Sequence, residues 1–113
     1  MVNATPGPEG QVVVITGASG GIGRASARMF GARGANVALL ARGEKGLAGA
    51  AHDVEVGGGK ALSLSVDTAD ADQVEQAAAD VEERFGPIDV WINVAFTSVF
   101  APFSEVSAAE FKR

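Results

Sequence analysis

Hydrophobic and polar residues alternate along this chain in blocks whose period changes. Continuous runs of branched aliphatic residues are typical of strands that are buried on both faces of a parallel sheet. Between these runs, apolar residues recur every three or four positions, as in helices with one buried face. The pattern predicts strands at 11–16, 36–41, 61–66 and 88–93, and helices at 22–33, 44–56 and 70–85.

Each predicted helix carries an apolar stripe that we expect to face the sheet. Glycine, or a Gly-Pro pair, follows each helix and ends it. The spacing of Asp70 and Gln73 also predicts a capping box at the start of the third helix. The stripes consist of Ile22, Ala25, Met29 and Phe30 in the first helix, Leu47, Ala50, Ala51 and Val54 in the second, and Val74, Ala78, Val81 and Phe85 in the third.

Strands that alternate with helices predict an α/β fold with a Rossmann-like, doubly wound parallel sheet. Right-handed crossovers restrict the strand order to 3-2-1-4, with the first two helices on one face and the third on the other. Four strands form only part of such a sheet. The outer edge of the fourth strand would be bare, and we therefore expect the chain to self-associate through it.

The two ends of the chain differ in pattern from the middle. Residues 1–10 contain Pro6 and Pro8 among small polar residues, which predicts a flexible tail. Residues 11–113 read as one domain that is incomplete at its carboxyl end. Ser107 and Glu110 have capping-box spacing, but the sequence stops after barely one further turn. We therefore expect the sequence to be truncated within a larger fold.

Composition narrows the possible functions. The 113 residues include no cysteine and no tyrosine, and their net charge is −5. These values exclude disulfides, thiol nucleophiles and a phenolic acid or base, and they disfavour nucleic acid and anionic membranes as partners. No apolar run is long enough to cross a membrane. Because nothing in a chain without cysteine depends on an oxidising compartment, we expect a cytoplasmic protein. The lone His52 has no second ligand at metal spacing, so we expect no metal site.

The turn after the first strand, T-G-A-S-G-G-I-G at residues 16–23, is rich in glycine. It is not a P-loop, because Gly23 stands where that motif requires lysine. It is also not a G-x-G-x-x-G dinucleotide fingerprint, because Ser26 occupies the last position. The turn nevertheless leads a strand through glycines to a helix N-terminus, whose N–H groups can bind an anion. The alternative is a tight turn without a ligand.

The run T-G-x-x-x-G-I-G, between a predicted strand and a predicted helix, resembles the cofactor loop of the short-chain dehydrogenases/reductases. The resemblance extends over about residues 11–113, which correspond to the amino-terminal half of that family's domain. It implies a nicotinamide dinucleotide as cofactor and a supporting role for Thr16 in the loop. It also implies contacts to the cofactor phosphates from Gly17, Ser19, Gly20, Gly21, Ile22 and Gly23.

Two later segments also resemble the family. Asp67, with Thr68 beside it, matches the aspartate that accepts a hydrogen bond from the adenine amino group. Asn93 and Ala95 match the first and third positions of the family's Asn-Asn-Ala-Gly segment, whose second and fourth positions are Val and Phe here. The alternative interpretations are a helix-capping or solvated acid for Asp67 and a structural turn residue for Asn93.

The end of the second predicted strand bears on cofactor preference. An acid there accepts hydrogen bonds from the ribose 2′-hydroxyl of NAD(H), whereas an arginine pairs with the 2′-phosphate of NADP(H). The sequence has Ala41 followed by Arg42, which favours NADP(H). Glu44 lies close enough to keep NAD(H) open, and Arg42 could instead be a solvated surface residue.

The family transfers hydride between the nicotinamide and a carbonyl or alcohol, using a tyrosine, a lysine and a serine that lie beyond the matched stretch. We therefore expect no catalytic residue in this chain and no activity from it alone. The first hypothesis is the cofactor-binding part of an NADP(H)-dependent oxidoreductase, which would meet a small-molecule substrate only with the rest of the domain. The alternatives are a stand-alone nucleotide-binding or regulatory module and a remnant that docks through its fourth strand.

Overall fold

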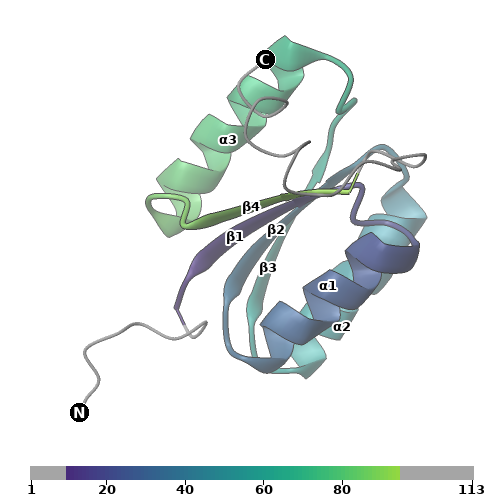
Figure 1. Cartoon of the computed structure of the whole chain (residues 1–113), viewed down its shortest axis with the longest axis vertical. Coiled ribbons are helices and arrows are strands. Elements are labelled where there is room, and N and C mark those ends of the chain that lie inside the picture. Colours follow the sequence, from purple (N-terminus) through teal and green to yellow (C-terminus); the bar gives the residue numbers. More distant parts are fainter. Residues whose placement is uncertain (1–9, 95–113) are drawn as a thin grey trace, which may run out of the picture.

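Residues 10–94 form a parallel four-stranded sheet with helices on both faces in the computed structural model, which describes this part of the chain (Figure 1). The strand order β3-β2-β1-β4 confirms the sequence prediction. The strands are β1 (Val12–Thr16), β2 (Asn36–Ala41), β3 (Lys60–Ser65) and β4 (Val90–Asn93), and the helices are α1 (Gly21–Ala32), α2 (Glu44–Val56) and α3 (Ala71–Phe85). All predicted boundaries lie within two residues of these.

The two central strands divide the core into two halves. Successive side chains of a strand point to opposite faces, so Val13 and Ile15 pack toward α1 and α2, whereas Val12 and Val14 pack toward α3. Figure 1 shows α1 and α2 side by side on one face of the sheet, with α3 on the other, as predicted. Every residue of β1 is buried, so the end of this strand is a rigid base for the loop that follows it.

The predicted inner face of the first helix is wrong. Ile22 is 74% exposed, Met29 is 47% exposed and Ala25 is exposed, while Phe30 is only half-buried. The residues that face the interior are Gly23, Ala27 and Gly31. The physical reason is a close approach of backbones, because a Cβ atom on Gly31 would lie 2.6 Å from the Cα of Val54 in α2. Small residues therefore occupy the contact face.

The other two helices follow their predicted stripes more closely. In α2, Leu47, Ala50 and Val54 are buried, and Ala51 packs beside them. In α3, Val81 is buried as predicted. Val74 and Phe85 also pack against the core, but the buried alanine of α3 is Ala77 and not Ala78.

The start of α3 has the predicted cap with one change of partner. Asp70 Oδ1 accepts hydrogen bonds from the backbone N–H groups of Asp72 and Gln73, at 3.0 and 3.2 Å. In a capping box the Gln73 side chain would accept from the N–H of Asp70. Its Oε1 accepts instead from the N–H of Asp67, at 2.9 Å, while the N–H of Asp70 donates to the Asp67 carbonyl.

Several predictions fall outside the described residues. They concern residues 1–9 of the expected tail, Ala95, and the expected helix start at Ser107 and Glu110. Within residues 10–94, no helix has the length and apolar character needed to span a bilayer. The same part of the chain contains no cluster of three side chains suited to bind a metal ion, and His52 is exposed.

Candidate functional site

An open cleft of about 620 Å³ lies at the carboxyl ends of β1 and β2. In parallel α/β sheets this edge is the usual place for a ligand, because the loops that leave the strands surround a crevice there. The cleft brings together most of the predicted cofactor residues. It is lined by Gly17, Ser19, Gly20, Gly21, Ile22, Gly23, Ala41, Arg42, Val66, Thr68 and Val94.

The glycine loop turns tightly out of β1. Gly17 has a φ of 71°, in the left-handed region that favours glycine, and its N–H donates to the Leu40 carbonyl at 2.8 Å. Further along, a Cβ atom on Gly23 would collide with the Gly17 carbonyl oxygen. The loop can fold back on itself only because both positions lack side chains.

The same loop leaves the N-terminus of α1 open to the cleft. The N-cap residue is Gly20, and no side chain accepts a hydrogen bond from the first N–H groups of the helix. These groups have no carbonyl partner within a helix, and the helix dipole adds a partial positive charge to them. Gly20 and Gly21 are exposed at the cleft, so an anion can approach this N-terminus closely.

Ile22 lies at the cleft rather than in the core. Its exposure of 74% is unusual for a large aliphatic side chain, and it lines the cleft beside the helix N-terminus. A ligand that covered this side chain would remove apolar surface from water, which is favourable. This placement agrees with its expected contact to a cofactor and explains why it does not point toward the sheet.

Arg42 follows β2 directly and provides the only charged side chain among the described residues that line this cleft. Its backbone carbonyl accepts a hydrogen bond from Ser65 Oγ at 3.3 Å, while the side chain is exposed. Within the described residues, Arg42 has no ion pair with an acid. Glu44 does not line the cleft. The guanidinium is therefore available to an anionic ligand.

Thr68 and Asp67 follow β3 but are placed differently. Thr68 lines the cleft, whereas Asp67 does not. Asp67 is half-buried, and its Oδ1 accepts a hydrogen bond from the N–H of Ala69 at 3.0 Å. This contact closes a short turn ahead of α3. This turn is not the cap of α3, because the N-cap residue of that helix is Asp70.

Asn93 connects the ends of two neighbouring strands. Its Oδ1 accepts a hydrogen bond from the Thr16 hydroxyl at 2.7 Å, and the N–H of Val94 donates to the Thr16 carbonyl at 3.2 Å. Val94 lines the cleft, but Asn93 does not. The arrangement agrees with the expected role of Thr16 in holding the loop. The neighbouring Ala95 lies outside the described residues.

Three apolar residues of the cleft were not predicted from the sequence: Ala41, Val66 and Val94. Each lies at the last position of a strand or just after it. No motif marks them, since any small or aliphatic residue could form this wall. The signal that could have found them is topological, because the carboxyl ends of all four parallel strands lie at the same edge of the sheet as the crevice.

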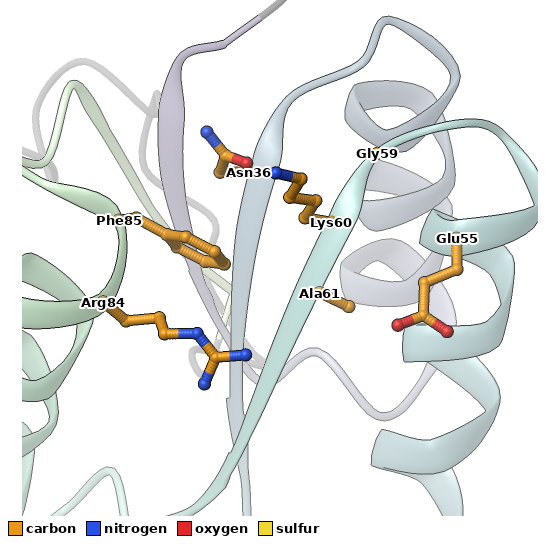
Figure 2. A pocket seen from close by; sticks show the side chains of 7 residues that line it. All are labelled: Asn36, Glu55, Gly59, Lys60, Ala61, Arg84 and Phe85. Atoms are coloured by element: carbon orange, nitrogen blue, oxygen red, sulfur yellow. The ribbon is translucent and has the colours of Figure 1, made fainter.

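A second cleft, of about 470 Å³, lies near the opposite ends of β2 and β3. Figure 2 shows Arg84 and Phe85 reaching it from the end of α3, with Asn36 and Lys60 at the starts of their strands. None of the predicted cofactor residues lines it. It also has no helix N-terminus among its lining residues. The geometry therefore favours the cleft beside the glycine loop as the functional site.

Comparison with protein families agrees with this placement. The family model described as short chain dehydrogenase matches residues 11–113. Among curated proteins, a short chain dehydrogenase of Pseudocercospora fijiensis is 37% identical over 94 residues, which cover 83% of this chain and 30% of the relative. The family-model match includes all four strands of the described sheet.

Solved structures share both fold and sequence with the chain. A metagenomic short-chain oxidoreductase in complex with NADP is 38% identical, with a TM-score of 0.74, over 91% of this chain and 47% of that one. An NADH-dependent reductase complexed with NAD is 29% identical, with a TM-score of 0.70, over 76% of this chain and 36% of that one. The chain thus spans less than half the length of these relatives.

Proposed function

Because the chain belongs to the short-chain dehydrogenase family, whose members bind nicotinamide dinucleotides, we propose that it holds the adenosine half of NADP(H) for an oxidoreductase. The reaction of the whole protein would move hydride between the nicotinamide and a carbonyl or alcohol of a small molecule. The 113 residues contain no tyrosine for the proton transfer, so this chain's own part is cofactor binding.

The observation that carries the proposal is the position of Arg42. It is the one charged side chain in the wall of the cleft, and it has no ion pair within the described residues. A guanidinium binds a phosphate with two parallel hydrogen bonds, whereas none of the described residues that line the cleft is an acid that could accept from a ribose 2′-hydroxyl. This chemistry favours the 2′-phosphate of NADP(H) over NAD(H).

We assign the remaining parts of the cofactor to other residues in and near the cleft. The exposed N-terminus of α1, with Ser19 and Ile22 beside it in the cleft, would hold the pyrophosphate. Thr68 and Asp67 would contact the adenine, and Asn93 and Ala95 the adenine ribose. These last four assignments rest on the resemblance to the family's motifs.

We also propose that residues 11–113 act as one cofactor-binding domain of a cytoplasmic protein. In the described part of the chain, β4 pairs with β1 alone. Its residues are only half-buried, so the edge of β4 is a surface through which copies of the chain can associate.

Replacement of Arg42 by alanine tests the cofactor preference. We expect Arg42→Ala to weaken binding of 2′,5′-ADP by about 1–3 kcal/mol, the scale of a hydrogen bond to a charged group, and to leave 5′-AMP binding unchanged. Isothermal titration calorimetry measures both ligands. Arg84→Ala is the matched control, because Arg84 lines the opposite cleft. Equal losses for the two ligands would refute the assignment of Arg42 to the 2′-phosphate.

A further inference from the structure

One side of α2 lies against the glycine loop and the first turn of α1. Gly46, Gly49 and Asp53 are three and four positions apart, so they share one side of the helix. We call these three residues the contact face of α2. None of them belongs to the motif that resembles the family, and none lines the cleft.

The first contact is between Gly46 and Ser19 in the loop. A Cβ atom on Gly46 would lie 2.5 Å from the Ser19 Cβ and 2.8 Å from the Ser19 carbonyl oxygen, well inside ordinary van der Waals contact. Ser19 thus rests directly on the backbone of α2. The nearby Gly43, at the N-cap of α2, has open space around the position of a Cβ atom.

The second contact involves Arg24, in the first turn of α1. Its guanidinium covers Gly49, where a Cβ atom would lie 2.8 Å from Nη1. Arg24 Nε is 2.7 Å from Asp53 Oδ2, and the Asp53 side chain is only 17% exposed. Arg28 approaches the same oxygen at 3.5 Å. The start of α1 is therefore attached to α2 by an ion pair that lies over a glycine.

We propose that the contact face of α2 is a positioning surface for the phosphate site, which sets where Ser19 and the N-terminus of α1 meet the cofactor pyrophosphate. The three residues touch no part of the cofactor themselves. They act on binding through Ser19 and Arg24, and the inference rests on the proposed dinucleotide function.

The loop yields more easily than the helix when this contact is disturbed. Leu47, Ala50 and Val54 bury the other side of α2 in the core, whereas Gly20 and Gly21 are exposed in the loop. A methyl group on Gly46 therefore displaces Ser19 and leaves α2 in place. Arg42, which precedes α2, keeps its position. Disruption of the contact face should thus weaken binding of a 5′-diphosphate and leave binding of a 2′-phosphate intact.

In the intact chain, two ligands distinguish an effect on the glycine loop from an effect on Arg42. ADP requires the loop, whereas adenosine 2′-monophosphate requires Arg42 and the adenine site. We expect Gly46→Ala and Asp53→Asn to weaken ADP binding about fivefold or more, the scale of one lost hydrogen bond, and to change binding of adenosine 2′-monophosphate less than about twofold. Asp53→Glu, which keeps the charge, should lose less ADP affinity than Asp53→Asn. Calorimetric titration measures both ligands, and circular dichroism checks that each variant is folded.

Matched controls distinguish the possible outcomes. Gly43→Ala, which adds the same methyl group in open space, should bind both ligands as the wild-type chain does. Equal losses for the two ligands, or none, would overturn the positioning role. If Gly46→Ala does not fold, Asp53→Asn decides alone, because it adds no bulk. A wild-type chain that binds neither ligand would refute the proposed function itself, and the positioning role with it.

Discussion

Gly23 shows how one missing side chain determines the shape of the candidate site. The loop returns so closely on Gly17 that a Cβ atom at Gly23 would collide with its carbonyl oxygen. The nearby Gly20 has a φ of −140°, which any residue can adopt, and open space around the position of a Cβ atom. The two glycines of one loop therefore have different roles, which their letters in the sequence do not distinguish.

The different surroundings of Gly23 and Gly20 predict different effects of substitution on stability. Gly23→Ala should lower the free energy of unfolding by about 3 kcal/mol, at the upper end of overpacking effects, because the colliding atoms belong to the backbone. Gly20→Ala should lower it by no more than about 1 kcal/mol, because the added methyl group meets open space and only the N-cap preference for glycine over alanine is lost. Urea denaturation followed by circular dichroism measures both variants. Similar stabilities for the two would contradict the packing described for the loop.

The sequence predicted some residues of the candidate cleft better than others. The glycine loop and Arg42 could be found because each has a signal within a few residues of sequence. For the loop it is a run of glycines directly after a strand, and for Arg42 it is a cation at the end of a strand. The local turn made by Asp67 could not be read from its position alone, because one carboxylate can serve a ligand or the next helix. Val94 lines the cleft because β4 lies next to β1 in the sheet, and these two strands are far apart in the sequence.

Between elements, the close packing of α1 on α2 explains the error in the predicted face of α1. Periodicity identifies the buried face of a helix when large apolar side chains make the contact. Here Gly31 lies against the backbone of α2, and the larger Ile22 and Met29 are left outside. The stripe of α2, with Leu47 and Val54 in the core, was predicted correctly because ordinary side chains pack there. Small-residue contacts leave no such periodic signal.

The ion pair between these helices makes stability depend on pH. The hydrogen bond from Arg24 holds the pKa of the Asp53 carboxyl below its usual value; burial opposes this, and the charges of Arg24 and Arg28 add to it. A carboxyl with a lowered pKa in the folded state stabilises the fold above its ordinary pKa. That contribution is lost as the pH falls through the lowered value.

We therefore expect the wild-type chain to be more stable than Asp53→Asn near neutral pH. The difference in the free energy of unfolding should shrink as the pH falls below the ordinary aspartate pKa of about 3.9 and then through the lowered pKa of Asp53. Denaturation curves at several pH values measure it. Glu55→Gln is the control, an exposed acid on the same helix that has no ion pair within the described residues. A difference that stayed constant with pH would contradict the role of this ion pair.

In the molecule as a whole, the two edges of the described sheet differ in character. The outer strand β3 presents Lys60, Ser63 and Ser65 as exposed polar residues, which discourage pairing with another strand. The strand β4 is half-buried throughout and includes Trp91 and Ile92. The strand order was predictable because crossover handedness leaves few arrangements for alternating strands and helices.

We expect copies of the chain to associate through the edge of β4. We expect sedimentation velocity to detect species larger than the monomer at micromolar concentration, in a proportion that rises with concentration, because β4 is an edge strand of the described sheet. Ser63→Lys, on the other edge, should leave this association unchanged. A wild-type chain that sediments as a single monomeric species would contradict the prediction.

The most direct test of the account is to locate the bound cofactor by nuclear magnetic resonance. Titration of the isotope-labelled chain with NADP⁺ should shift the amide signals of residues 17–23, 41–42 and 66–68, which surround the cleft at the carboxyl ends of the strands. The signals of Asn36, Lys60 and Arg84, at the opposite cleft, should stay unchanged. Shifts confined to that opposite cleft, or no shifts at saturating NADP⁺, would contradict the assignment of the glycine loop and Arg42 to cofactor binding.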